Sequence, residues 1–266
     1  MYINKVLNAG EYALICNYTP KGFGAPGRKR EKRIRETPKA MEKYNRHKRA
    51  EKLQLLMLMN FDKGYHITLD YPKGQRPQTY EEAEKILQKF LYKVSRKLKK
   101  ENRLFKYIAI TERGKRQKAL HHHMIMESDP FILKMITEIW GNHIKISQMY
   151  EEGAYKDLAD YFCKIETKEE QTKGKSKYHR SRNLKEPTVR ARIVAGALKD
   201  DPVVPDGYEL VTDSVVNGVN EIVGIKYQRY LIRRVKKERK SDAKGIQKCN
   251  LWESIKSIFK KRKKNE

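Results

Sequence analysis

Cysteine and long apolar runs are both scarce in this 266-residue chain. Its three cysteines, Cys16, Cys163 and Cys249, lie far apart, and no C-x-x-C pair occurs. We therefore expect neither a disulfide framework nor a thiolate zinc site, and we expect a reducing cytoplasm as the compartment. No apolar run approaches about 18 residues, so no segment is expected to cross a bilayer. The first 19 residues lack a basic start followed by an apolar block, which argues against a signal peptide.

Acidic side chains are also few relative to basic ones. The chain has 33 Asp and Glu against 60 Lys and Arg, which gives a formal net charge of +27. A field of this sign attracts polyanions, so nucleic acid, an anionic membrane and an acidic protein are the candidate partners. A phosphate-binding loop of the form G-x-x-x-x-G-K-S/T is absent, which excludes a fused motor of the P-loop type.

The clearest globular pattern runs from about residue 53 to residue 170. Thr79 with Glu82 forms a capping box, and Asp129 followed by Pro130 is typical of a helix start. The sequence predicts strands at 65–71, 105–111, 120–126 and 143–149, and helices at 83–98, 130–140 and 154–166. This order predicts an α+β fold of the ferredoxin-like (RRM-like) kind, an antiparallel sheet with helices on one face.

Basic segments flank this core and set the expected domain boundaries. We divide the chain into a basic N-terminal arm at 1–52, a globular domain at 53–187, a β-leaning accessory region at 188–235 and a basic tail at 236–266. The basic run at 20–52 is typical of a mobile arm or a solvated helix. The tail contains an amphipathic piece that suits either a DNA-binding arm or a membrane-surface helix, and we favour the DNA arm over a membrane partner. Its apolar residues are Leu251, Trp252, Ile255, Ile258 and Phe259.

Three consecutive histidines lie on the third predicted strand. Because side chains alternate along a strand, His121 and His123 share one face and His122 points the other way. Two neutral imidazoles at this spacing can reach one divalent metal ion, and Glu112, which ends the preceding strand, would lie beside them in a hairpin. Two nitrogens and one oxygen leave positions open for water and a phosphate oxygen, as a Lewis-acid metal requires. A register shifted by one residue would instead turn His122 alone toward the metal.

Tyr161 and Lys164 lie three residues apart on the last predicted helix, and therefore on nearly one face. A tyrosine, whose ordinary pKa is about 10, needs a nearby cation or metal ion to attack as a phenolate. Lys164 supplies positive charge, and it could also stabilise a pentavalent phosphate. Tyr155 is six residues earlier, about 240° around a helix, so it faces elsewhere and a single nucleophile is expected.

Three stretches in this order resemble the motifs of the HUH endonuclease superfamily: ITLDY, then ITERGKRQKALHHHMIM, then LADYFCKIETK. Within that superfamily the chain is most similar to the rolling-circle replication initiators, or Rep proteins, of plasmids, phages and single-stranded DNA viruses. The resemblance covers residues 55–187, roughly half of the chain. The stretch 178–187 (YHRSRNLKEP) also resembles a segment that follows the nuclease core in initiators of Gram-positive mobile elements.

The resemblance implies a role for each matching residue. It gives His121, His123 and Glu112 as ligands of Mg²⁺ or Mn²⁺, Tyr161 as the nucleophile and Lys164 as its partner lysine. The tyrosine would nick DNA, leaving a 5′-phosphotyrosyl link and a free 3′-hydroxyl, and a later transesterification would rejoin the strand. DNA-binding residues are expected at Arg113, Lys115, Arg116, Arg180, Arg182 and Asn183. The implied partners are single-stranded DNA at a replication origin, a host helicase and a DNA polymerase, in the cytoplasm of a bacterial host.

The sequence departs from the family pattern at two positions. The residue between the paired histidines is usually bulky and hydrophobic but here is His122, and Asp70 stands where a hydroxyl residue is commoner. A related relaxase or transposase would share the chemistry, although a relaxase usually has three metal-binding histidines and a tyrosine near its N-terminus. A different class also stays open, a non-catalytic nucleic-acid-binding protein that stacks bases on sheet aromatics. The aromatic residues suited to stacking are Tyr65, Phe105 and Tyr107.

Overall fold

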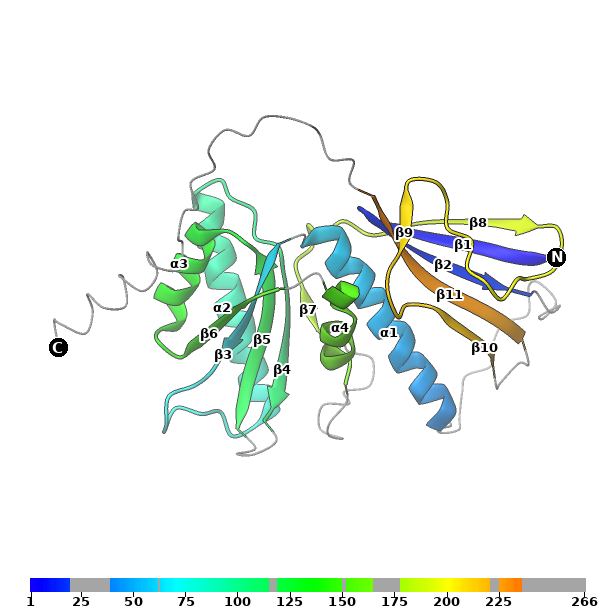
Figure 1. Ribbon diagram of the computed structural model, residues 1–266. Helices are drawn as coiled ribbons and strands as arrows, with labels where there is room; N and C mark the ends of the chain where they lie inside the picture. Colours follow the sequence, from blue (N-terminus) through cyan, green and yellow to red (C-terminus); the bar gives the residue numbers. More distant parts are fainter. Residues whose placement is uncertain are drawn as a thin grey trace, which may run out of the picture. The chain divides into compact units, whose positions relative to one another are not determined.

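The computed structural model of the chain describes residues 1–19, 39–61, 63–114, 119–149, 152–164, 178–220 and 225–235 (Figure 1). These residues form an α+β fold of antiparallel sheets and four α-helices, which confirms the predicted class. The predicted tail at 236–266 and most of the predicted basic arm, at 20–38, lie outside the described residues. None of the described helices is long and apolar enough to span a membrane.

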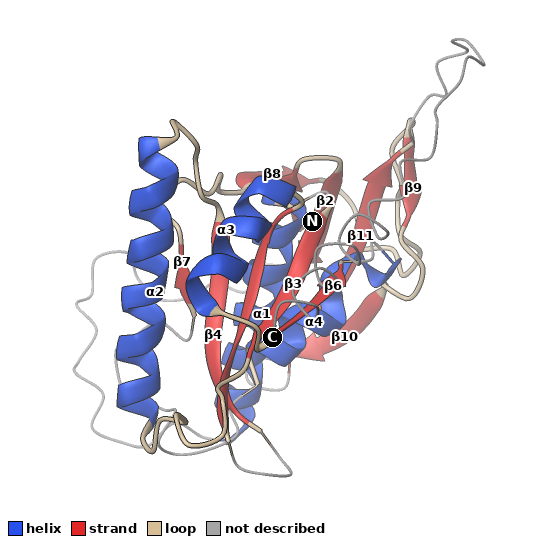
Figure 2. Ribbon diagram, turned by 90° about the vertical axis from the view of Figure 1, so that its left-hand side faces the viewer, coloured by secondary structure: helices blue, strands red, loops and turns tan. Residues whose placement is uncertain are grey.

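A five-stranded sheet is built from the segment in which the sequence predicts four strands (Figure 2). All of its neighbouring strands pair antiparallel. The strand order is β6 (Ile144–Gln148), β3 (Gly64–Leu69), β5 (Leu120–Glu127), β4 (Tyr107–Arg113) and β7 (His179–Arg180). The four predicted strands are confirmed with small shifts at their ends, and β7 is an addition that the sequence does not predict.

Two helices cover one face of this sheet. α2 (Tyr80–Lys100) begins at the predicted capping box, in which the Thr79 hydroxyl accepts from the backbone N–H of Glu82 and the Glu82 carboxylate accepts from the backbone N–H of Thr79. α3 (Pro130–Trp140) begins at Asp129, whose carboxylate accepts from backbone N–H groups of the first turn. Both predicted helix starts are therefore confirmed. Alternate strand residues face these helices and form one core with them: Tyr65, Ile67, Leu69, Ala109, Met124 and Met126.

The opposite face of the five-stranded sheet is covered as well. α1 (Lys39–Asn60), the short 3-10 helix η1 (Glu152–Tyr155) and α4 (Lys156–Phe162) pack together on this side. The shared core contains Leu53, Leu56, Ile108, Ile110, Ile125 and Phe162. The prediction of helices on one face only is therefore wrong. The reason is that the apolar half of α1, with the sequence LQLLMLM, continues directly from a basic run that is typical of a mobile arm.

A second, six-stranded sheet combines strands from both ends of the described chain. Its strands, in order, are β10 (Val216–Asn220), β11 (Ile225–Arg234), β2 (Tyr12–Tyr18), β1 (Tyr2–Ala9) and β8 (Thr188–Val194), with β9 (Tyr208–Leu210) also paired to β11. Residues 1–19 thus belong to a sheet rather than to the predicted arm, whereas the predicted β character of the region after 188 is confirmed. β1 and β2 turn at Gly10, whose φ of 67° is one that glycine adopts readily.

Candidate active site

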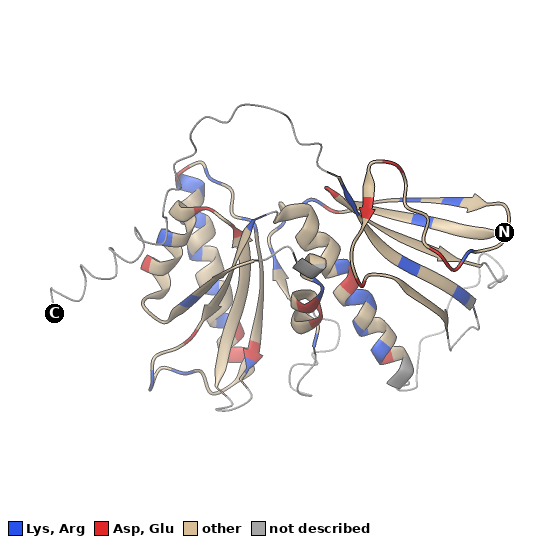
Figure 3. Ribbon diagram, viewed as in Figure 1, with Lys and Arg blue, Asp and Glu red and all other residues tan. Residues whose placement is uncertain are grey.

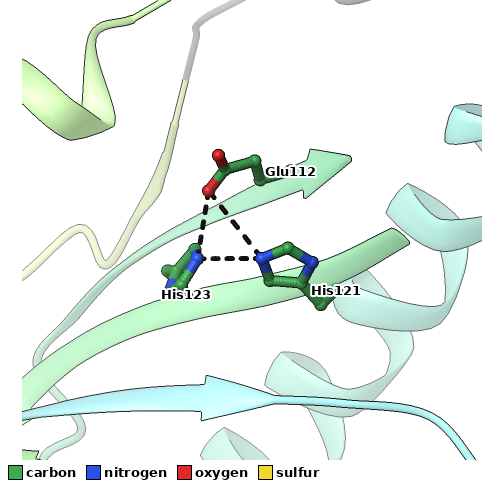
Figure 4. A group of neighbouring side chains, drawn as sticks. All are labelled: Glu112, His121 and His123. Carbon is green, nitrogen blue, oxygen red and sulfur yellow. Dashed lines mark hydrogen bonds and ion pairs between the residues drawn. The ribbon is translucent and has the colours of Figure 1, made fainter. Parts of the chain in front are cut away.

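The pairing of β4 with β5 brings three side chains with metal-binding atoms together. Glu112 lies directly opposite His121 in the register of the two strands. Glu112 Oε2 is 3.1 Å from His123 Nε2 and 3.8 Å from His121 Nε2, and the two Nε2 atoms are 3.0 Å apart (Figure 4). The sequence therefore predicts this geometry correctly, with two imidazoles on one face and a carboxylate at their level. This group could hold a metal ion.

The other ring nitrogen of each imidazole has its own partner. His121 Nδ1 lies 3.3 Å from the carbonyl oxygen of Ala119, which only accepts, so Nδ1 carries the proton. His123 Nδ1 lies 3.1 Å from Nε2 of His66 and 3.3 Å from the hydroxyl of Thr68. Partners of this kind fix the tautomer and the ring orientation of metal-binding histidines. Both Nε2 lone pairs can then point at the cluster that they form with the carboxylate of Glu112.

Burial controls the protonation of these side chains. It lowers the pKa of His121, with a further contribution from nearby His123, and it lowers the pKa of His66 to about 4. Burial also raises the pKa of Glu112, but hydrogen bonds with His123 and Tyr161 outweigh that effect, and the net pKa lies below the ordinary value. Neutral imidazoles and an ionised carboxylate at neutral pH place three electron-pair donors around one point. A cation at that point would relieve their mutual repulsion.

Tyr161 approaches this group from α4. Its hydroxyl donates to Glu112 Oε2 and lies 2.9 Å from His123 Nε2, and the residue keeps 36% of its surface exposed. Tyr155 behaves differently: it is buried, its φ is 58°, and its hydroxyl donates to the backbone oxygen of Phe61 at 3.0 Å. The expectation that the two tyrosines face different ways is confirmed. Of these two tyrosines Tyr161 reaches the cluster, and Tyr155 has a structural role.

Lys164 does not share a helix face with Tyr161, contrary to the sequence prediction. α4 ends at Phe162, and Cys163 caps it with a backbone N–H bonded to Ala159. Lys164 follows this cap, where its backbone N–H donates to the carbonyl of Tyr161 at 3.1 Å. The helix is shorter than the predicted 154–166 at its start as well, because Tyr155 adopts a left-handed conformation that a continuous helix cannot contain.

The residues predicted to bind DNA are divided between two places. Arg113 directly follows Glu112 at the end of β4, whereas Lys115 and Arg116 lie outside the described residues. Arg180 pairs with Ile108 in the sheet and forms an ion pair with Glu186 at 2.5 Å. Ile108 is four residues before Glu112, so Arg180 lies roughly 13 Å from the cluster along the strand. Arg182 and Asn183 are exposed and follow Arg180 away from the cluster.

A pocket that the sequence does not predict opens beside the cluster. Its volume is about 850 Å³, and it is lined by Glu112, His121 and Tyr161 together with residues of two other loops. Those loops contribute Asp70, Lys73, Arg76, His143 and Lys145. The basic, Pro- and Gly-containing stretch PKGQRP after the first motif is the sequence signal that could have indicated it. His66 is a second residue that sequence reasoning missed, because its partner His123 is 57 residues away.

His122 points to the opposite face of the sheet and is completely buried. Its Nε2 accepts from the Tyr71 hydroxyl at 2.5 Å, and its Nδ1 bonds to the Thr111 hydroxyl at 2.9 Å. Thr111 in turn donates to Glu84, and Glu84 also accepts from His179 at 2.5 Å. His122 is thus a satisfied core residue, and the shifted register that would turn it toward the metal is excluded.

Two of the three aromatics suited to base stacking are buried. Tyr65 is 8% exposed and Phe105 is 6% exposed, because both belong to the core between the sheet and its helices. A nucleic acid base cannot reach rings that α2 and α3 cover. Neither ring can therefore belong to an RRM-like base-stacking surface.

One comparison with known proteins gives a match. Residues 64–179 match the model of a family described as Replication-associated protein ORF2. This segment runs from β3 to the first residue of β7, so it contains the three clustered side chains and Tyr161. No curated protein and no solved structure matches the chain. The family match supports a role in replication initiation in general, implies an interaction with DNA and is consistent with a rolling-circle Rep protein.

Proposed function

We propose that this chain is a rolling-circle replication initiator that nicks single-stranded DNA through Tyr161 and later rejoins the strand. The observation that carries the proposal is the contact of the Tyr161 hydroxyl with both Glu112 and His123. A nucleophile beside a group able to hold a cation is the arrangement that tyrosine-mediated phosphoryl transfer requires. The family match over this same segment supports a replication setting.

The cluster fits a small divalent cation. Cis ligands around an octahedral ion with bonds of about 2.1 Å lie about 3.0 Å apart. The distances of 3.0 Å between the two Nε2 atoms and 3.1 Å from His123 Nε2 to Glu112 Oε2 agree with that value. Mg²⁺ or Mn²⁺ held by Glu112, His121 and His123 would polarise a phosphate oxygen and leave coordination positions for it.

The protein's own groups account for the remaining chemistry. Glu112 accepts the hydrogen bond from Tyr161 and so offers an acceptor for the departing phenol proton. The Oη of Tyr161 then bonds to phosphorus, the bond from phosphorus to the 3′-oxygen breaks, and that oxygen takes up a proton. The 5′ end stays linked to the tyrosine, and the 3′-hydroxyl can prime synthesis. Attack by a 3′-hydroxyl reverses the step and seals the strand, because the phosphotyrosyl bond conserves the energy.

The remaining assignments follow from this function. The strand order β6-β3-β5-β4, built from a βαββαβ segment, supports a ferredoxin-like nuclease domain within 53–187. Lys164, just beyond the helix of the nucleophile, is proposed to stabilise phosphate charge. Origin DNA, a host helicase and a host polymerase would be the partners in a bacterial cytoplasm.

Covalent capture tests the proposal directly. The protein is incubated with a mixed pool of single-stranded oligonucleotides and Mn²⁺, and adducts are resolved on a denaturing gel. We expect an adduct that EDTA abolishes and that Tyr161→Phe reduces below detection, because the Tyr161 hydroxyl is the one that contacts the cluster among the described residues.

The matched control is Tyr155→Phe, which removes a buried hydroxyl from the same helical region and should keep the adduct. Persistence of the adduct in Tyr161→Phe would show that the nucleophile is misassigned. DNA binding by the unaltered chain that is indifferent to EDTA, with no adduct at all, would favour the non-catalytic alternative.

A further inference from the structure

The pocket beside the cluster has a wall of cations on the side away from β7. It continues from Glu112, His121 and Tyr161 to Lys73, Arg76 and Lys145 without interruption by a described element. We infer that this pocket binds the single-stranded DNA on one side of the scissile phosphate, with its backbone phosphates on these three cations. The inference rests on the proposed function, and it replaces Arg180, Arg182 and Asn183 as the residues that hold DNA next to the cluster.

The first part of this wall is a constrained loop between β3 and α2. The backbone N–H of Gln75 donates to the carbonyl of Pro72 at 3.2 Å, which closes a turn, and Gly74 within it has a φ of 88°. Lys73 and Arg76 lie on this turn and both line the pocket. A loop fixed by proline and a closed turn loses little conformational entropy when it binds a ligand, which favours binding.

The second part of the wall is the start of β6, which Asp70 attaches to the end of β3. The backbone N–H of Asp70 donates to the carbonyl of His143 at 2.9 Å, and its carboxylate pairs with Lys145 at 2.9 Å. The Lys145 side chain is 78% exposed, so this ion pair is weak and can be exchanged for a phosphate. Asp70, for which the family pattern offers no role, thus positions a cation at the pocket.

The chemistry of the lining indicates a backbone-binding site. Three cations face a pocket with two carboxylates, and one of these, Glu112, belongs to the cluster. Phosphate contacts supply affinity and orientation without reading sequence, and they make binding depend on salt. Asn142 and His143 at the rim offer hydrogen-bonding groups to an adjacent base.

Salt-dependent DNA binding tests the inference. The Tyr161→Phe protein is titrated with a labelled single-stranded oligonucleotide of mixed sequence, at salt concentrations from about 50 to 200 mM. Because each phosphate contact to a single strand contributes about 0.7 to the slope of log K against log salt, Lys73→Ala, Arg76→Ala and Lys145→Ala together should lower that slope by about 2 and the affinity roughly 100-fold at about 0.1 M salt. Each single substitution should weaken binding about fivefold.

A matched control uses three exposed lysines that do not line the pocket. Lys and Arg are abundant elsewhere, as Figure 3 shows for α1 and α2, so a general charge effect has to be separated from a pocket effect. Lys89→Ala, Lys93→Ala and Lys97→Ala, on the exposed side of α2, remove the same charge and should change the slope far less. Mn²⁺ affinity should be the same in all variants.

The outcomes separate the two proposals. If the unaltered chain forms a Tyr161 adduct but the pocket variant binds with the slope of the control variant, the pocket inference fails while the nicking function stands. If no adduct forms but the pocket variant alone loses affinity and slope, the pocket holds DNA and the nicking function fails.

Discussion

The two faces of β5 use the same residue type in opposite ways. His121 and His123 project beside Glu112 and Tyr161, where Nε2 atoms and a carboxylate oxygen converge on one point. His122, between them, projects into the core under α2 and α3, where each ring nitrogen has a neutral hydroxyl partner. On one face the imidazoles are arranged to bind a cation. On the other face an imidazole is fixed as a neutral core residue.

The difference shows that partners, rather than burial, decide what a histidine does here. His123 is nearly as buried as His122, with 7% and 0% of their surfaces exposed. Their surroundings differ in charge: an ionised carboxylate faces His123, whereas hydroxyl groups separate His122 from Glu84. Substitutions on each face should separate the two roles, and the largest effect is expected on the face of the cluster.

Removing a histidine from the cluster face should abolish metal binding with little change in stability. We expect His121→Ala to lower Mn²⁺ affinity by at least about 100-fold, since the loss of a ligand exceeds the loss of a group that only orients one. The unfolding free energy should change little, because His121 has a backbone carbonyl as its printed partner outside the cluster and lies at the edge of the pocket. Calorimetric titration with Mn²⁺ and thermal unfolding of the metal-free protein measure both quantities.

The control on the other face is His122→Ala, which should have the reverse effects. It leaves a cavity and the Tyr71 hydroxyl without its partner, so the unfolding free energy should fall by about 2–4 kcal/mol. Mn²⁺ affinity of the folded fraction should be retained. Equal losses of Mn²⁺ affinity in both variants would contradict the separation of the faces.

His66 should affect the cluster face only through His123. Its Nε2 accepts a hydrogen bond from His123 Nδ1, and it contributes no atom to the cluster. His66→Ala should therefore weaken Mn²⁺ binding by about 10- to 100-fold, the range seen for groups that orient metal ligands. His66→Gln, whose amide can also accept, should recover part of the loss. An unchanged Mn²⁺ affinity in His66→Ala would show that Thr68 suffices to orient the ring.

Acid should destabilise the metal-free protein through the core face. Burial lowers the pKa of His122 to about 3, with His121, His123 and His179 adding to the shift and Glu84 opposing it. The unfolded chain, with a pKa of about 6.5, binds more protons between these two values, so stability falls as the pH drops through about 6.5 toward 3. From about pH 7 to about pH 5.5 the expected loss is about 1 kcal/mol. Urea unfolding at both pH values should show it, and His122→Gln should remove most of this dependence.

Local patterns predict the parts of the site that depend on one strand or one hairpin. Alternation along a strand separates the faces of the three histidines, and the hairpin of β4 and β5 brings Glu112 to their level. The helix starts at Thr79 and Asp129 are equally local, and they are confirmed. These features were predictable because each needs only residues that are close in sequence.

Features that depend on distant residues were not predictable in this way. His66 meets His123 across 57 residues, and the pocket wall joins a loop near residue 73 to one near residue 145. α1 is hard to recognise because half of it is basic and exposed, while its apolar half becomes core only against both sheets. Lys164 was misplaced because a helix end at Cys163 has no glycine or proline to indicate it.

The six-stranded sheet has a consequence for how the chain folds as it is made. β2 is synthesised early, yet its partner β11 follows about 200 residues later, and Asn17 and Gln228 bond side chain to side chain across that separation. At roughly 5–20 residues per second, the ribosome needs on the order of 10–40 s to deliver β11. During that interval the hairpin of β1 and β2 lacks both of its neighbouring strands. The five-stranded sheet, whose strands lie between β2 and β8 in the chain, can be complete before the sheet that precedes it has closed.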